Sequence, residues 1–96
     1  MAFTKILIER KVKPGKDKEF KQLMRDLRTR AMHVEGFISG ETLQSSADPT
    51  FHVTISTWKS LTSWEDWVKS KERKDIQDKI DKFLVEPTKM TPFHYE

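Results

Sequence analysis

The segment Glu35–Leu43, with the tryptophan and serine that follow it at Trp58 and Ser60, constrains the fold of this 96-residue chain more than any other feature. Gly36 precedes a strand-like segment, a turn follows, and a second strand-like segment ends in Trp58. Ser60 is a favoured helix N-cap residue, and it stands directly before a helix-like segment. This order predicts an antiparallel hairpin that leads into a capped helix. A tryptophan at the end of a strand, just before a helix, is a candidate pocket wall.

The remaining segments carry equally clear periodicities. Apolar residues at spacings of three and four between Lys16 and Met32 predict an amphipathic helix. β-Branched residues in alternation predict strands, and the turn residues Ala47–Thr50 separate two of them. The expected strands are Phe3–Val12, Phe37–Ser45, Phe51–Trp58 and Lys89–Tyr95, and the expected helices are Lys16–Met32, Leu61–Lys69 and Glu72–Leu84.

This order predicts an α+β fold of the ferredoxin-like β-α-β-β-α-β type, with a four-stranded antiparallel sheet and its helices on one face. We expect residues 1–96 to form a single domain. Ile6, Leu7 and Ile8 are consecutive and apolar, so both faces of the first strand need cover. Helices on one side leave the other face open, and a second copy of the chain is the natural cover. The sequence therefore predicts a homodimer.

Composition excludes several classes of function. The net charge is +3, from 18 basic and 15 acidic residues that are interleaved, which is not the one-sign face of a nucleic-acid binder. The run that contains Lys69, Lys71, Arg73 and Lys74 is interrupted by acidic residues and is expected to be a solvated face. Cysteine is absent and the three histidines are far apart, so no thiol chemistry or metal site is expected. No segment approaches the ~18 apolar residues of a membrane span. The N-terminus also lacks the positively charged region and long apolar run of a secretory signal. We therefore expect a cytoplasmic protein with no membrane partner.

The face of the third strand that carries Trp58 is the best candidate for a site. Alternation places Trp58, His52, Thr54 and Ser56 on this face, and apolar residues on the opposite one. In one interpretation, Trp58 and His52 line a pocket between sheet and helices. In the other, Trp58 is core and His52 is a hydrogen-bonded or exposed strand residue. In the following helix, one tryptophan is expected in the core, and Trp67 is the candidate for a pocket or interface.

The chain resembles the antibiotic biosynthesis monooxygenase (ABM) family of dimeric α+β barrels over nearly its whole length. The resemblance rests on the following residues: Pro14-Gly15-Lys16, Glu35-Gly36-Phe37-Ile38-Ser39-Gly40-Glu41, Trp58, and Ser60-x-x-Ser63-x-x-x-Trp67-x-x-Ser70. It implies a homodimer and no cofactor. Members of this family do different things: some oxygenate phenols without a cofactor, some open haem, and some act on small signal molecules.

The haem-opening branch of the family implies three residues that this chain only partly matches. Trp58 matches the tryptophan of that branch. Ile8 stands where it has an asparagine, and Gln77 stands where it has the axial histidine. Glutamine is a poor iron ligand compared with imidazole. Haem degradation is therefore disfavoured.

Two functions remain open. The first is a cofactor-independent monooxygenase acting on a small aromatic or quinol-type substrate, in which His52 is the candidate catalytic base and Trp58 and Trp67 contact the substrate. The second is a non-catalytic dimer that binds a small aromatic ligand. A convergent pair of polar groups in the cavity would favour the enzyme, whereas a cavity with only Trp58 and aliphatic residues would favour binding.

Overall fold

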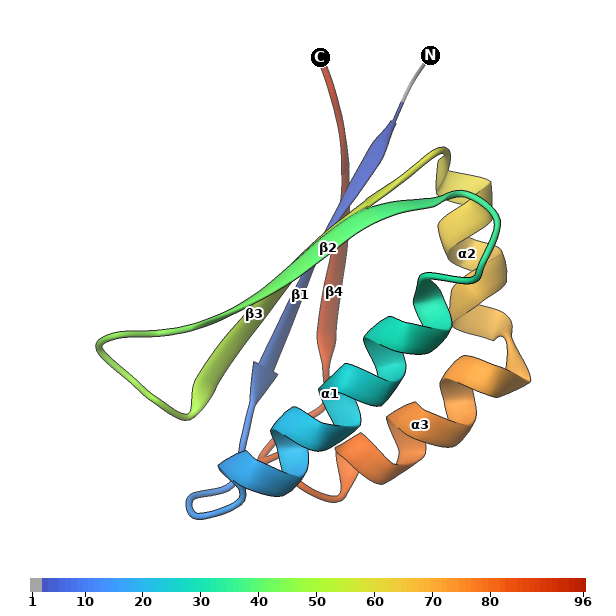
Figure 1. Ribbon diagram of the computed structural model, residues 1–96. Coiled ribbons are helices and arrows are strands. Elements are labelled where there is room, and N and C mark those ends of the chain that lie inside the picture. Colours follow the sequence, from blue (N-terminus) through green and yellow to red (C-terminus); the bar gives the residue numbers. More distant parts are fainter. Residues whose placement is uncertain (1–2) are drawn as a thin grey trace.

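The computed structural model describes residues 3–96, which form one four-stranded antiparallel sheet with three helices on one of its faces (Figure 1). The strands are β1 (Thr4–Lys11), β2 (Phe37–Gln44), β3 (Phe51–Trp58) and β4 (Lys89–His94), in the spatial order β2-β3-β1-β4. The predicted ferredoxin-like fold is confirmed. β4 pairs only with β1, so Pro92 lies on an edge strand, where proline is tolerated.

The helices are α1 (Asp17–Ala31), α2 (Leu61–Lys69) and α3 (Lys71–Asp81), which gives the order β-α-β-β-α-α-β. Ser60 caps α2, because its side chain accepts a hydrogen bond from the Ser63 N–H. Ser70 adopts an extended conformation and separates α2 from α3. Its Oγ donates to the Trp67 carbonyl at 2.7 Å and accepts from the Arg73 N–H at 3.2 Å. One residue therefore ends one helix and begins the next.

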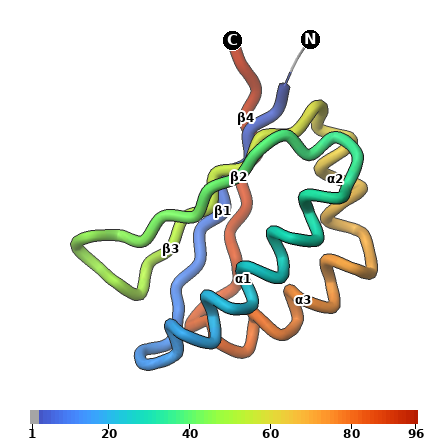
Figure 2. Tube along the Cα trace, viewed as in Figure 1, coloured from blue at the N-terminus to red at the C-terminus, as the bar shows by residue number. Residues whose placement is uncertain are grey.

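α3 ends earlier than predicted. Its apolar spacing continues to Leu84, but the helix stops at Asp81 and Leu84 forms an isolated bridge with Val12. This tertiary contact overrides the helical periodicity of the segment. In the tube view the ends of β1 and β4 lie side by side, as the pairing of Thr4 with His94 requires (Figure 2).

The hydrophobic core fills the space between the sheet and the helices. On β1 the residues that face the helices, among them Ile6 and Ile8, are buried, and Trp58 from β3 is 2% exposed. Phe20 and Ile80 close this core from α1 and α3. Among residues 3–96, no helix covers the opposite face of the sheet (Figure 1).

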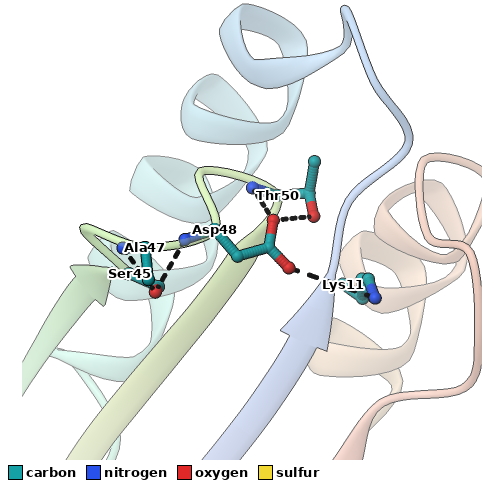
Figure 3. Close-up of polar contacts among 5 residues, drawn as sticks. All are labelled: Lys11, Ser45, Ala47, Asp48 and Thr50. Carbon is teal, nitrogen blue, oxygen red and sulfur yellow. Dashed lines mark hydrogen bonds and ion pairs between the residues drawn. The ribbon is translucent and has the colours of Figure 1, made fainter.

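The loop between β2 and β3 is closed by side-chain hydrogen bonds, as its turn residues predict (Figure 3). Ser45 Oγ accepts from the backbone N–H groups of Ala47 and Asp48, at 3.2 and 3.1 Å. Asp48 Oδ1 accepts from the N–H and the hydroxyl of Thr50, at 3.1 and 2.6 Å. The hydrogen bonds from Thr50 lower the pKa of Asp48, and Lys11 lies 4.0 Å from its other oxygen. This loop fixes the register in which β3 presents its side chains.

Gly36 should be the least replaceable glycine in the chain. Its φ is +95°, and an added Cβ would lie 2.5 Å from Ser63 Oγ at the start of α2. Gly36→Ala therefore combines backbone strain with a steric clash, and we expect a loss of about 2–4 kcal/mol in the free energy of unfolding. Gly15 is the matched control, because its φ is +81° but nothing lies within 4 Å of an added Cβ.

Gly15→Ala should cost only the backbone strain, about 1–2 kcal/mol. Urea denaturation of both variants measures the difference. Equal losses would contradict the clash with Ser63.

Candidate functional site

A cavity of about 440 Å³ lies between α1 and the helix-facing side of the sheet. Its volume is within the range of small-molecule sites. Five aromatic side chains line it, and these are Phe20, Phe37, Trp58, Trp64 and Trp67. The cavity therefore offers flat apolar walls that suit an aromatic ligand.

His52 lies in the lining of this cavity, on the same strand face as Trp58, as the alternation in β3 predicts. It is 3% exposed, and its ring packs against Phe20 with the centroids 4.8 Å apart. Its Nε2 atom is buried and has no hydrogen-bond partner within residues 3–96. A buried polar atom without a partner is uncommon, and here it adjoins a cavity.

Arg10 is the cross-strand neighbour of His52. The register of β1 and β3 pairs the two residues, so their side chains lie next to each other on one face of the sheet. Arg10 is 2% exposed, and its Nε is the other buried side-chain nitrogen without a partner in the described residues. Two neighbouring residues of the cavity lining thus each carry an unsatisfied nitrogen, and that of Arg10 is a permanent donor.

Gln77 connects Arg10 to a second buried arginine. Its Oε1 accepts from Arg10 at 3.0 Å and from Arg73 at 3.3 Å, and its Nε2 donates to Asp81 and Thr88 at 2.8 and 3.2 Å. Gln77 lines a separate pocket of about 480 Å³, whereas Arg73 lines both that pocket and the cavity. The Gln77 amide therefore holds both arginines by hydrogen bonds without itself lining the cavity.

Charge and burial shift the protonation of this cluster. Burial, and secondarily the positive charge of Arg73, lower the pKa of Arg10 to about 10. Burial likewise lowers the pKa of Arg73, although Asp81 opposes the shift. The pKa of His52 falls below its usual 6.5, mainly because of burial, with Asp17 opposing. At neutral pH both arginines are charged and His52 is a neutral base.

Trp58 and Trp67 form one aromatic group in the cavity lining. Their rings stack with centroids 6.4 Å apart, and Phe37 meets Trp58 edge-on at 5.2 Å. Trp58 Nε1 donates to Ser56 Oγ at 3.1 Å, which satisfies its one polar atom. The two tryptophans belong at once to the core and to the cavity wall, so the two interpretations of Trp58 are not exclusive.

Arg73 corrects an expectation from the sequence. Its charged neighbours suggest a solvated face, but Arg73 is 6% exposed. It lies one helical turn before Ile76 and Gln77 and two turns before Ile80, and all three of these are buried. This spacing, and the alternation of Arg10 with Ile6 and Ile8, were the signals that could have placed both arginines inside.

The two positions compared with haem-opening proteins lie in different surroundings. Ile8 lines the cavity, whereas Gln77 is not among its lining residues and is engaged with Arg10 and Arg73. The absence of an axial haem complex remains a prediction. Within residues 3–96, no group of three or more His, Asp or Glu side chains is placed to hold a metal ion, and no helix has the length and apolar character to cross a membrane.

Solved structures similar to this one share its complete fold. A conserved protein from Methanosarcina mazei Go1 matches with a TM-score of 0.90 at 24% identity, over 97% of this chain and 92% of that chain. SnoaB, a cofactor-independent oxygenase from Streptomyces nogalater, matches with a TM-score of 0.90 at 11% identity, over 100% and 95%. A protein from Mycobacterium tuberculosis matches with a TM-score of 0.84 at 13% identity, over 95% and 92%. At these identities the likeness concerns the fold.

The family assignment rests on the sequence of the chain. No curated protein matches the chain significantly. The sequence profile described as "Antibiotic biosynthesis monooxygenase" matches residues 4–79, from the start of β1 to near the end of α3. The match spans both arginines, His52 and the tryptophans of the cavity. This chain belongs to the antibiotic biosynthesis monooxygenase family.

Proposed function

We propose that the protein is a cofactor-independent oxygenase whose substrate is a small phenol or quinol bound in the cavity. Family membership and the fold shared with SnoaB, a cofactor-independent oxygenase, support the reaction class. The observation that carries the proposal is the pair of unpartnered nitrogens, His52 Nε2 and Arg10 Nε. A ligand-binding protein needs no base in its pocket, so a neutral histidine beside a buried arginine favours the enzyme over the non-catalytic alternative.

The two nitrogens together are the complement of one hydroxyl group. Pro49 has no N–H, so its backbone hydrogen bond to His52 uses the carbonyl oxygen. Because Nε2 has no partner, we assign the donor to Nδ1, which leaves a lone pair on Nε2. Arg10 Nε is always a donor. A phenolic hydroxyl can donate its hydrogen to His52 and accept one from Arg10.

This arrangement suits the activation of a phenol toward oxygen. His52 takes the phenolic proton, and the adjacent guanidinium of Arg10 stabilises the phenolate. The phenolate gives one electron to O₂, and the resulting radical pair combines at the ring carbon para to the oxygen as a hydroperoxide. Loss of water and of the para hydrogen yields the quinone. One phenol and one O₂ thus give one quinone and one water, with no added reductant.

Oxygen uptake tests this proposal. Protein freed of metals and flavins should consume one O₂ per phenol with a free para C–H, and form the quinone, faster than the buffer does. The controls are the same substrates blocked at the para position, which should bind without this turnover. Binding of para-free substrates with no oxygen uptake beyond the background would favour the non-catalytic alternative.

We also propose a homodimer formed through the outer face of the sheet. Leu7, Val53 and Ile55 are half-buried there, and Leu43 and Phe93 are 50% and 52% exposed. The register of β1, β2, β3 and β4 places all five on the side away from the helices. Obligate homodimers commonly bury over ~2,000 Å², and a sheet face of this kind can supply such an area.

Light scattering of dilute protein should therefore give twice the 11.4 kDa chain mass. Leu43→Lys, which puts a charge on the exposed apolar face, should shift the population toward monomer. Wild-type protein that remains at the mass of one chain would contradict the dimer.

A further inference from the structure

We propose that the substrate is an aromatic acid, in which the phenol ring also carries a carboxylate that Arg73 binds. This inference rests on the proposed function, since it names the substrate class of the same cavity. It concerns binding, so it can be tested without turnover. The charge, burial and geometry of the cavity lining each support it.

The lining of the cavity has a large surplus of positive charge. Its five basic side chains are Arg10, Lys21, Arg25, Arg28 and Arg73. The one acidic residue of the lining, Glu41, pairs with Ile55 and so directs its side chain to the other face of the sheet. Lys21, Arg25 and Arg28 belong to α1 and are exposed, whereas Arg10 and Arg73 are buried. Positive charge at the rim attracts anions, and positive charge in the interior binds them.

The buried charges lack a directly paired anion, because Asp81, whose charge raises the pKa of both arginines, is hydrogen-bonded to Gln77 instead. No carboxylate oxygen of the described residues lies within 4.0 Å of either guanidinium, because the one ion pair found there joins Lys11 and Asp48. The acceptor that Arg10 and Arg73 share is a neutral amide oxygen of Gln77. Burying a charge without a counter-charge is costly. A carboxylate in the cavity would supply the direct pair that Asp81 does not make.

The geometry assigns the two ends of the substrate to different arginines. Arg10 stands beside His52, where the hydroxyl would bind. Arg73 belongs to α3, one helical turn before Gln77, and one of its nitrogens is also 3.3 Å from Met90 Sδ. Arg10 Nη2 and Arg73 Nη2 donate to one oxygen atom at 3.0 and 3.3 Å, so these two nitrogens can be no further apart than the two bond lengths together. One ring can therefore place a hydroxyl at Arg10 and a carboxylate at Arg73.

A matched pair of probes tests this assignment. 3-Hydroxybenzoate and 3-hydroxybenzamide have nearly the same shape, but only the acid is charged at neutral pH. Calorimetric titration under nitrogen measures binding alone. Wild-type protein should bind the acid roughly 10- to 100-fold more tightly than the amide, the range for a hydrogen bond to a charged group. Arg73→Gln should lose this preference.

Lys74→Gln is the control, because it removes the same charge from the neighbouring, exposed position of α3. It should keep the full preference. Circular dichroism checks that Arg73→Gln is folded, and if it is not, Arg73→Lys, which keeps the charge, should retain part of the preference. Equal binding of acid and amide by the wild type, no binding of the acid up to its solubility, or an unchanged preference in folded Arg73→Gln would each overturn the proposal. Tight binding of the acid without oxygen uptake would instead support this inference and count against the oxygenase.

Discussion

Replacing His52 with glutamine should lower the rate of phenol oxygenation by roughly 100- to 10,000-fold, the usual contribution of a positioned general base. Glutamine keeps a polar side chain of similar reach but cannot take a proton at neutral pH. His52 is buried against Phe20 and has no partner at Nε2, so the change removes the base without breaking a hydrogen bond at that atom. Oxygen uptake at saturating phenol measures the effect.

The pH profile gives an independent check on the same residue. Burial lowers the pKa of His52 below its usual 6.5, so the neutral, basic form predominates above that pH. The rate of the wild type should therefore rise with pH through a midpoint below 6.5 to a plateau, and this rise should be absent from the residual rate of His52→Gln. The control is His33→Gln, because His33 is exposed just after α1 and outside the cavity lining. A His52→Gln variant with wild-type turnover would remove His52 as the base.

Trp58→Ala should cost about 3–5 kcal/mol in the free energy of unfolding, as truncation of a large buried aromatic residue does. Trp58 is 2% exposed, packs against Phe37 and Trp67, and donates to Ser56. Small domains are stable by only about 5–15 kcal/mol, so this loss would take much of the total. Chemical denaturation measures it directly.

Trp64→Ala is the matched control for this prediction. Trp64 lines the same cavity but is only partly buried, so its truncation should cost clearly less. Ligand binding should weaken in both variants, because both remove an aromatic wall. If Trp58→Ala were no less stable than Trp64→Ala, Trp58 would be a cavity wall without a core role.

Local sequence rules predicted the parts of this fold that depend on local physics. The bounds of β3, the cap at Ser60 and the turn at Asp48 follow from alternation and from short-range hydrogen bonds. The end of α3 could not be predicted in the same way. It depends on the bridge between Leu84 and Val12, which are far apart in the sequence.

The residues of the candidate site could be predicted only in part, for a similar reason. Period-two alternation put His52 and Trp58 on one strand face, and the structure brings both to one cavity with Trp67. Arg10 and Arg73 were missed, because isolated basic residues in a charged chain are ordinarily solvated. Alternation in β1 and helical spacing in α3 put both on buried faces, but no local pattern encodes the contact of Gln77 in α3 with Arg10 in β1.

The most direct test of the central claim is a crystal structure of the protein with 3-hydroxybenzoate, grown and soaked without oxygen. We expect the ring between the aromatic walls and the phenolic oxygen within hydrogen-bonding distance of both His52 Nε2 and Arg10 Nε. A hydroxyl bound away from these two atoms, or a ring bound outside the cavity, would contradict the proposed site.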